Sequence, residues 1–235
     1  MMNLFDGLYP YEAVLMVLGV VLFVVLVIAF IVLIVKGRPF GTLLSFFAVP
    51  VVMIGFPSIK SIQFHDGVVT VDKLTHDLQK DPTNAALRTS LDKQVVEVTS
   101  RPTTNPASVA AIGSAQFALG DHIAAAINLR KALEAAPQLT QALELKKRID
   151  LDNTLTKVIT QVQQHPDDAA AKESLRKAVA EAGQLQIASP QLLTNIARAH
   201  AAIGNRTEAL NLADKALAIN PSLNLAKQVK SQMTR

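Results

Sequence analysis

Two long apolar runs open the chain, and the rest alternates apolar and polar positions with the spacing of amphipathic helices. Residues 13–35 form 23 positions without a charged side chain, and residues 40–59 form another 20. Either run reaches the ~20 residues that a helix needs to cross a ~30 Å hydrocarbon layer. The pattern therefore predicts an all-α chain, with a two-helix transmembrane anchor over residues 13–59 ahead of a water-exposed helical part.

Residues 36–39 join the two apolar runs, and so short a connection predicts an antiparallel helical hairpin. A cleaved signal peptide is disfavoured, because no basic residue precedes the first run and its apolar core exceeds 7 to 15 residues. Two alternatives stay open for the second run, which could be a buried helix of a soluble domain or a re-entrant segment.

The second apolar run contains a proline at its centre and small residues near its start. Pro50 lacks a backbone N–H and is expected to kink a helix there. Gly41, Thr42 and Ser45 offer a small face on which a neighbouring helix can pack closely.

The charges that flank the runs predict an orientation. Lys36 and Arg38 lie in the connecting loop, whereas the tail of residues 1–12 carries Asp6 and Glu12 and no basic side chain. Short basic loops stay in the cytoplasm, although Lys60 after the second run opposes this assignment. We therefore expect a bacterial inner-membrane protein with two spans and a C-terminal domain in the periplasm.

Residues 60–71 form a short segment between the anchor and the helical part. Apolar Phe64 and Val68 flank a His65-Asp66-Gly67 turn signal. This pattern predicts a short β-hairpin or an extended juxtamembrane stalk.

The helical part is an internal repeat with a period of 84 residues. Residues 74–150 aligned without a gap on residues 158–234 give 22 identities in 77 positions. A fixed period is the signature of a solenoid, so we expect two tandem units, residues 72–150 and 151–235.

Prolines and glycines punctuate each unit at matching positions and predict its helices. They delimit helices near residues 83–100, 106–119 and 121–136. A solenoid unit needs an even number of helices to keep its direction, and residues 138–165 contain neither Gly nor Pro. We expect one long helix there, with a break near residues 150–153 as the alternative.

Residues 105–137 and 189–221 resemble tetratricopeptide repeats. The small residues, turn glycines and closing prolines of that family recur in both copies, as Gly113 and Ala197, Gly120 and Gly204, Ala125 and Ala209, Ala132 and Ala216, and Pro137 and Pro221. Both copies depart from the family where it has large aromatic residues, which are replaced by Gln116 or His200 and by Val109 or Leu193. The resemblance implies helical hairpins stacked into an α-solenoid.

Little in the sequence indicates chemistry. The chain has no cysteine, and its five histidines lack the spacing of a metal or catalytic motif. From residue 60 onward, 21 basic residues intersperse with 17 acidic ones, which is unlike the basic face of a nucleic-acid binder. We expect neither an enzyme nor a cofactor.

The resemblance implies that the first helix of each hairpin lines a groove for a partner protein. By position, the groove residues are Ser114, Phe117, Gln191, Thr194, Asn195 and Arg198. Arg198 suits an acidic group, while Ala110 and Ser114 replace the Lys and Asn of the family's carboxylate clamp.

These observations favour a membrane-anchored scaffold that binds other membrane or periplasmic proteins of a bacterial envelope complex. We expect it to contact the lipid bilayer and not to bind nucleic acid. Two alternatives remain. The chain could be a self-assembling structural subunit of a larger membrane machine, or a non-catalytic accessory subunit of an enzyme.

Overall fold

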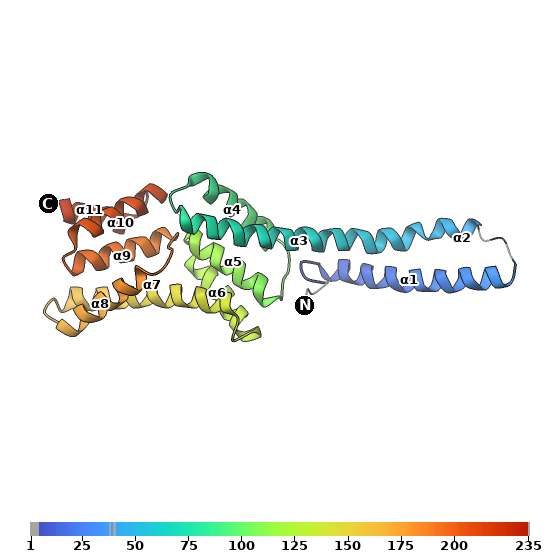
Figure 1. The fold of residues 1–235 in the computed structure, drawn as a ribbon, viewed down its shortest axis with the longest axis horizontal. Coiled ribbons are helices and arrows are strands. Elements are labelled where there is room, and N and C mark those ends of the chain that lie inside the picture. Colours follow the sequence, from blue (N-terminus) through green and yellow to red (C-terminus); the bar gives the residue numbers. More distant parts are fainter. Residues whose placement is uncertain (1–4, 38, 40, 235) are drawn as a thin grey trace. The chain divides into compact units, whose positions relative to one another are not determined.

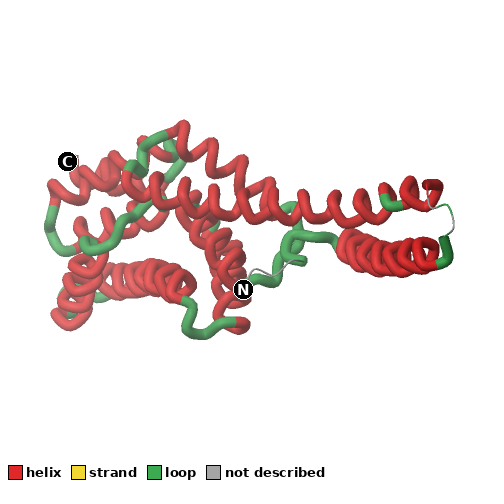
Figure 2. Tube along the Cα trace, turned by 45° about the vertical axis from the view of Figure 1, so that its right-hand side comes forward, coloured by secondary structure: helices red, strands yellow, loops and turns green. Residues whose placement is uncertain are grey.

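The computed structural model describes residues 5–37, 39 and 41–234. Helices and loops make up these residues, and no strand occurs among them (Figure 2). The chain divides into two compact units, one of residues 1–69 with 97–105 and one of residues 70–96 with 106–235. The fold is all-α, as the sequence predicts.

The first unit contains α1 (Pro10–Val35) and residues 48–69 of α3 (Ala48–Lys80), which run antiparallel and are joined through the short α2 (Gly41–Phe46) (Figure 1). A Cβ added at Gly19 of α1 would lie 2.8 Å from Met53 Cβ, so the helices touch there. Phe47 packs edge-on against Phe23 and Phe30. The two apolar runs therefore form the predicted hairpin.

The second run is interrupted before Pro50 and is not kinked at it, contrary to what the sequence predicts. The helix is interrupted at Phe47, and α3 begins at Ala48, so Pro50 lies in the first turn of α3, where a missing N–H costs nothing. Arg38, assigned above to the connecting loop, and Phe40, assigned to the second apolar run, lie outside the described residues. The side chain of Thr42 also lies outside them.

The predicted hairpin or stalk over residues 60–71 is wrong, because α3 runs without a break through this segment. Its buried positions include Ser61, Phe64, Val71, Thr75 and Leu78. Their spacing of three, four or seven residues is that of one helix face. The helical period therefore overrides the local turn signal, and α3 has no break at residue 60.

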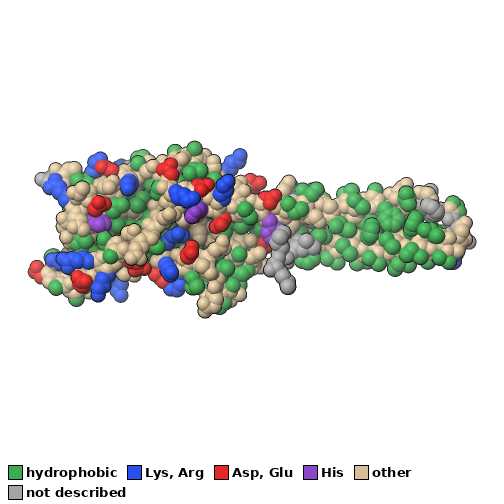
Figure 3. Space-filling model, viewed as in Figure 1, with side chains coloured by type: hydrophobic (Ala, Val, Ile, Leu, Met, Phe, Trp, Pro, Cys, Tyr) green, Lys and Arg blue, Asp and Glu red, His purple; other side chains and the backbone are tan. Residues whose placement is uncertain are grey.

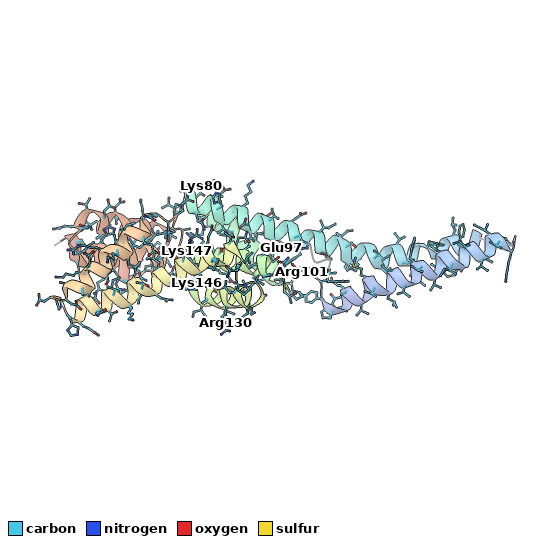
Figure 4. All side chains as sticks on the ribbon, turned by 60° about the horizontal axis from the view of Figure 1, so that its bottom comes forward. Lys80, Glu97, Arg101, Arg130, Lys146 and Lys147 are labelled. Carbon is cyan, nitrogen blue, oxygen red and sulfur yellow. The ribbon has the colours of Figure 1, made fainter. Side chains whose placement is uncertain are left out.

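Residues 5–12, expected to be part of a tail, are held in the first unit by the segment that connects α4 (Ala85–Thr99) to α5 (Pro106–Leu119). Arg101, which is labelled in Figure 4, pairs with the buried Glu12 carboxylate at 3.1 Å. The Tyr9 hydroxyl donates to the Ser100 carbonyl at 2.7 Å. Gly7 adopts φ +75°, and a Cβ there would meet the Phe64 ring. Because Glu12 is buried, losing Arg101 would leave its carboxylate as an unpaired charge, so this ion pair holds residues 5–12 against the α4–α5 connection.

The second unit repeats itself with the predicted period. The pairs are α4 and α8 (Ala169–Ala182), α5 and α9 (Pro190–Ala202), α6 (His122–Ala135) and α10 (Arg206–Ile219), and α7 (Thr140–Gln164) and α11 (Asn224–Thr234). In each pair the second helix begins 84 residues after the first. The internal repeat is therefore also a repeat of structure.

The turns within each hairpin follow the sequence signals. Gly120 and Gly204 have φ of +103° and +86°, a region that glycine enters without steric cost. The Asp121 carboxylate accepts a hydrogen bond from the Ala124 N–H at 3.0 Å and caps α6. Ala125 and Ala209 are fully buried in the hairpin seams.

The long helix α7 is continuous over 25 residues, so the alternative break near residues 150–153 does not occur. It packs against α5, α6, α8 and α9. Leu145, Leu155 and Ile159 are fully buried along it and belong to a core that extends over both repeats. One helix thus supplies the shared core of the two copies.

We expect Ala209→Leu to destabilise the protein by ~1–3 kcal/mol, because three extra carbons would enter a seam that has no space for them. Thermal unfolding of the full chain in detergent, followed by circular dichroism, measures the effect. Ala180→Leu on the exposed face of α8 is the matched control. An equal melting temperature for the two variants would contradict the assignment of Ala209 to the seam.

Candidate protein-binding grooves

Two hollows lie beside the first helices of the hairpins in the second unit. The first, of about 210 Å³, lies between α3, α5 and α7 and is lined by Asp72, Thr75, His76, Gln79, Ala111, Ser114, Gln141, Glu144 and Arg148. The second, of about 360 Å³, lies between α7, α9 and α11 and is lined by Val162, Gln163, Arg198, Ala201, Ala202, Leu225, Gln228, Val229, Gln232 and Met233. We call them the first and the second groove.

The first groove is polar and contains both signs of charge. Arg148 donates from Nη2 to the Gln79 side-chain oxygen at 3.3 Å, while its buried Nε has no hydrogen-bond partner among the described residues. Burial lowers the pKa of Arg148, and the nearby Glu144 carboxylate opposes this shift. Glu144 and Asp72 therefore already supply negative charge in this groove.

The second groove is mixed in character. Arg198 lies in it and donates from Nη1 to the Asn195 side-chain oxygen at 3.2 Å. Burial lowers the pKa of Arg198, so its charge is partly removed from water. None of the described residues that line this groove is acidic. An arginine held in this way can donate hydrogen bonds to a carboxylate, and the side-chain amide groups around it can donate further ones.

The six side chains predicted to line the groove divide between grooves and core. Ser114 lines the first groove and Arg198 the second. Phe117 is buried and stacks on the His122 ring at 4.4 Å between centroids. Thr194 is also buried, and its hydroxyl donates to the Pro190 carbonyl at 2.8 Å. Phe117 and Thr194 therefore stabilise the packing of α5 and α9.

The remaining two predicted residues contact neighbouring elements. Gln191 covers the turn after α5, where a Cβ added at Gly120 would come within 2.4 Å of its oxygen. Asn195 donates to the Asp152 carboxylate at 2.8 Å and to the Thr156 hydroxyl at 3.2 Å. Asn195 thus ties α9 to the preceding repeat by hydrogen bonds, whereas the Gln191 side-chain oxygen is buried without a hydrogen-bond partner among the described residues.

Asp152 is the centre of a polar network that the sequence did not indicate. Its Oδ2 lies 2.9 Å from His122 Nδ1, and His122 Nε2 lies 2.7 Å from the Ser189 hydroxyl. Ser189 is 1% exposed and accepts from the Leu192 N–H to cap α9. The order Asp, His, Ser is that of a hydrolase triad, but the hydroxyl is enclosed and occupied by the helix cap. The network therefore joins α6, α7 and α9.

Arg88 of α4 reinforces the same junction. Its guanidinium donates to the carbonyl of Ala118 at 3.1 Å and to that of Ala188 at 2.9 Å, so it bridges the end of α5 and the start of α9. Burial lowers the pKa of Arg88. The equivalent residue of the second copy is Lys172, which cannot form the same fork of hydrogen bonds.

No group of three potential metal ligands occurs among the residues that the structure describes.

We expect Asp152→Ala to lower the free energy of unfolding by about 1–3 kcal/mol, because it leaves the His122 ring and the Asn195 amide without their acceptor. Urea denaturation of the full chain in detergent measures this. Asp150 on the same helix pairs with Lys146 at the surface, so Asp150→Ala should cost only about 0.3–0.5 kcal/mol. Equal losses would show that the network contributes nothing beyond a surface ion pair.

The comparisons with known proteins agree with the hairpin geometry. Residues 107–139, which cover α5 and α6, match the tetratricopeptide repeat family model. No curated protein and no solved structure matches the chain. The matched hairpin is repeated in α9 and α10 with the same 84-residue offset. The chain therefore contains a tetratricopeptide repeat, a repeat type that in general serves as a scaffold for protein–protein interaction.

Proposed function

We propose that the protein is a membrane-anchored scaffold that holds a partner protein of the bacterial envelope in the second groove. The observation that carries this proposal is Arg198, a partly desolvated cation in a groove whose described lining has no acid.

The anchor rests on the exposed apolar surface of the first unit. The helices α1 and α3 are long and apolar enough to cross a membrane, and few residues of their most apolar stretches are buried. Apolar side chains cover α1 and the first part of α3 in the space-filling view (Figure 3). With 26 residues, α1 is about 39 Å long at 1.5 Å per residue, more than the ~30 Å hydrocarbon core. A lipid environment is the one that favours such a surface.

The partner is expected to present a carboxylate beside an apolar side chain. Arg198 can pair with the carboxylate, and Gln163, Gln228 and Gln232 can donate further hydrogen bonds. The apolar wall consists of Val162, Leu225, Val229 and Met233. The first groove is a weaker candidate for an acidic group, since its own carboxylates would repel it.

Photo-crosslinking tests the groove. A benzophenone amino acid placed at Gln232 should give an adduct with a partner in native membranes, and the same residue at Arg176 on α8 should not. Adding Arg198→Glu should lower the adduct yield at least about tenfold, as expected for the loss of a charge-assisted hydrogen bond.

An adduct that persists with Arg198→Glu would place the partner elsewhere. An adduct whose only other component is a second copy of this chain would favour the self-assembling subunit instead.

The orientation predicted from Lys36, Arg38 and the acidic N-terminal flank is tested by a reporter fusion. Alkaline phosphatase fused after residue 235 should be active in a bacterial host, because the reporter needs the oxidising periplasm to form its disulfides. A green fluorescent protein fusion at the same point should be dark. An inactive phosphatase at normal expression, with a bright fluorescent fusion, would reverse the topology.

A further inference from the structure

An apolar stripe lies exposed on the outer face of α6. It consists of Ile123, Ala126 and Ile127 and ends at Arg130, all of which are exposed. Ile123 is 78% and Ile127 43% exposed. The spacing of three, four and seven residues places them on one side of the helix. The neighbouring isoleucines form a contiguous apolar surface of the kind that a partner surface can cover.

The second copy of the repeat shows that the fold does not require these isoleucines. The equivalent positions of α10 are Thr207 and Asn211, both polar and exposed. The same hairpin therefore forms with either kind of side chain. The α6 stripe must then be explained by something outside its own hairpin.

A complementary apolar pocket lies beside α8, α9 and α10 of the second copy. It has a volume of about 350 Å³ and is lined by Pro82, Thr83, Val179, Ala182, Gly183, Leu185, Ile187, Leu193, Ile196, His200, Glu208, Leu212 and Lys215. In the first copy Gln116 and Asn128 face each other here through a 2.7 Å hydrogen bond. His200 and Leu212 replace them, so this polar link across the hairpin is absent and an apolar wall takes its place.

Two charged side chains of α10 border the pocket. Glu208 lies in the first turn of α10, and Lys215 lies two turns further on. His200 is the other titratable group of the lining; burial lowers its pKa and Glu208 opposes the shift. The pocket therefore presents a negative end, an apolar centre and a positive end.

We propose that α6 of one molecule docks antiparallel along α10 of a second copy of this chain, with the α6 stripe in the α8–α9–α10 pocket. Arg130 then lies opposite Glu208, and Ile127 lies against Leu212. Ile123 covers the aliphatic stem of Lys215, whose ammonium group points toward Asp121 at the start of α6.

The dimensions and charges of the two surfaces support this arrangement. Seven residues separate Arg130 from Ile123, and seven separate Glu208 from Lys215, so both surfaces extend about 10 Å along their helices. Arg130 is 72% exposed (Figure 4), and its ion pair with Glu134 spans 3.8 Å. Such a surface pair contributes little, so Arg130 is available for a stronger partner.

The contact joins two unlike surfaces of identical chains. Such a heterologous contact builds rings or chains unless the two copies satisfy both contacts at once. This self-association uses α6 and the α8–α9–α10 pocket, and no residue that lines this pocket also lines the second groove. It is therefore independent of the proposed partner binding.

Sedimentation equilibrium of the full chain in detergent micelles tests the proposal. The wild type should associate reversibly. The double variant Ile123→Thr with Ile127→Asn, which copies the residues of α10, should raise the dissociation constant at least tenfold. Arg176→Glu, an exposed charge on α8 away from the pocket lining, is the control and should change it less than twofold.

A charge exchange separates this contact from other modes of association. Arg130→Glu and Glu208→Arg should each weaken association about tenfold, whereas an equimolar mixture of the two variants should restore it, because each pair of surfaces then meets opposite charges. The melting temperature of each variant should stay at that of the wild type. A wild-type chain that remains monomeric at all concentrations, or a mixture that shows no restoration, would overturn the proposal.

Discussion

The carboxylate of Asp152 sets how the two repeats meet. It lies in the middle of α7, contacts the first residue of α6 through His122, and accepts from Asn195 of α9. His122 passes the contact on to Ser189, which caps α9. A polar network that is largely shielded from water is stabilising only while each member keeps its partner. Asp152 therefore helps to hold the two copies together beside the second groove, along with the Arg88 bridge and the shared core of α7.

The helices of the repeats could be predicted because their limits are local signals. Proline at the first position of α5 and α9, and glycine with positive φ after α5 and α9, act within a few residues and recur at a fixed offset. Parity of the repeat then required a long α7, which the structure contains. Local chemistry and periodicity together were sufficient for this part of the fold.

The errors arose where a longer-range preference outweighs a local one. Gly67 follows a turn-like His-Asp pair, but the buried positions from Ser61 to Leu78 keep a helical spacing, and α3 continues through them. Phe117 and Thr194 were placed in the groove by their repeat position, yet both are buried. The Asp152 network joins residues up to 67 positions apart, and no spacing rule in a single sequence relates them.

The two copies share a backbone plan and differ in what they expose. At one pair of positions the first copy has a hydrogen-bonded Gln116 and Asn128, and the second has His200 and Leu212 beside an apolar pocket. At another pair the first copy has Ile123 and Ile127, and the second has Thr207 and Asn211. Each apolar surface is thus present in the copy where the other is missing. If both copies used these positions only to stabilise the hairpin, the same residue types would serve in both. Their opposite distribution fits the proposed contact between two molecules of this chain, in which each apolar surface meets the other.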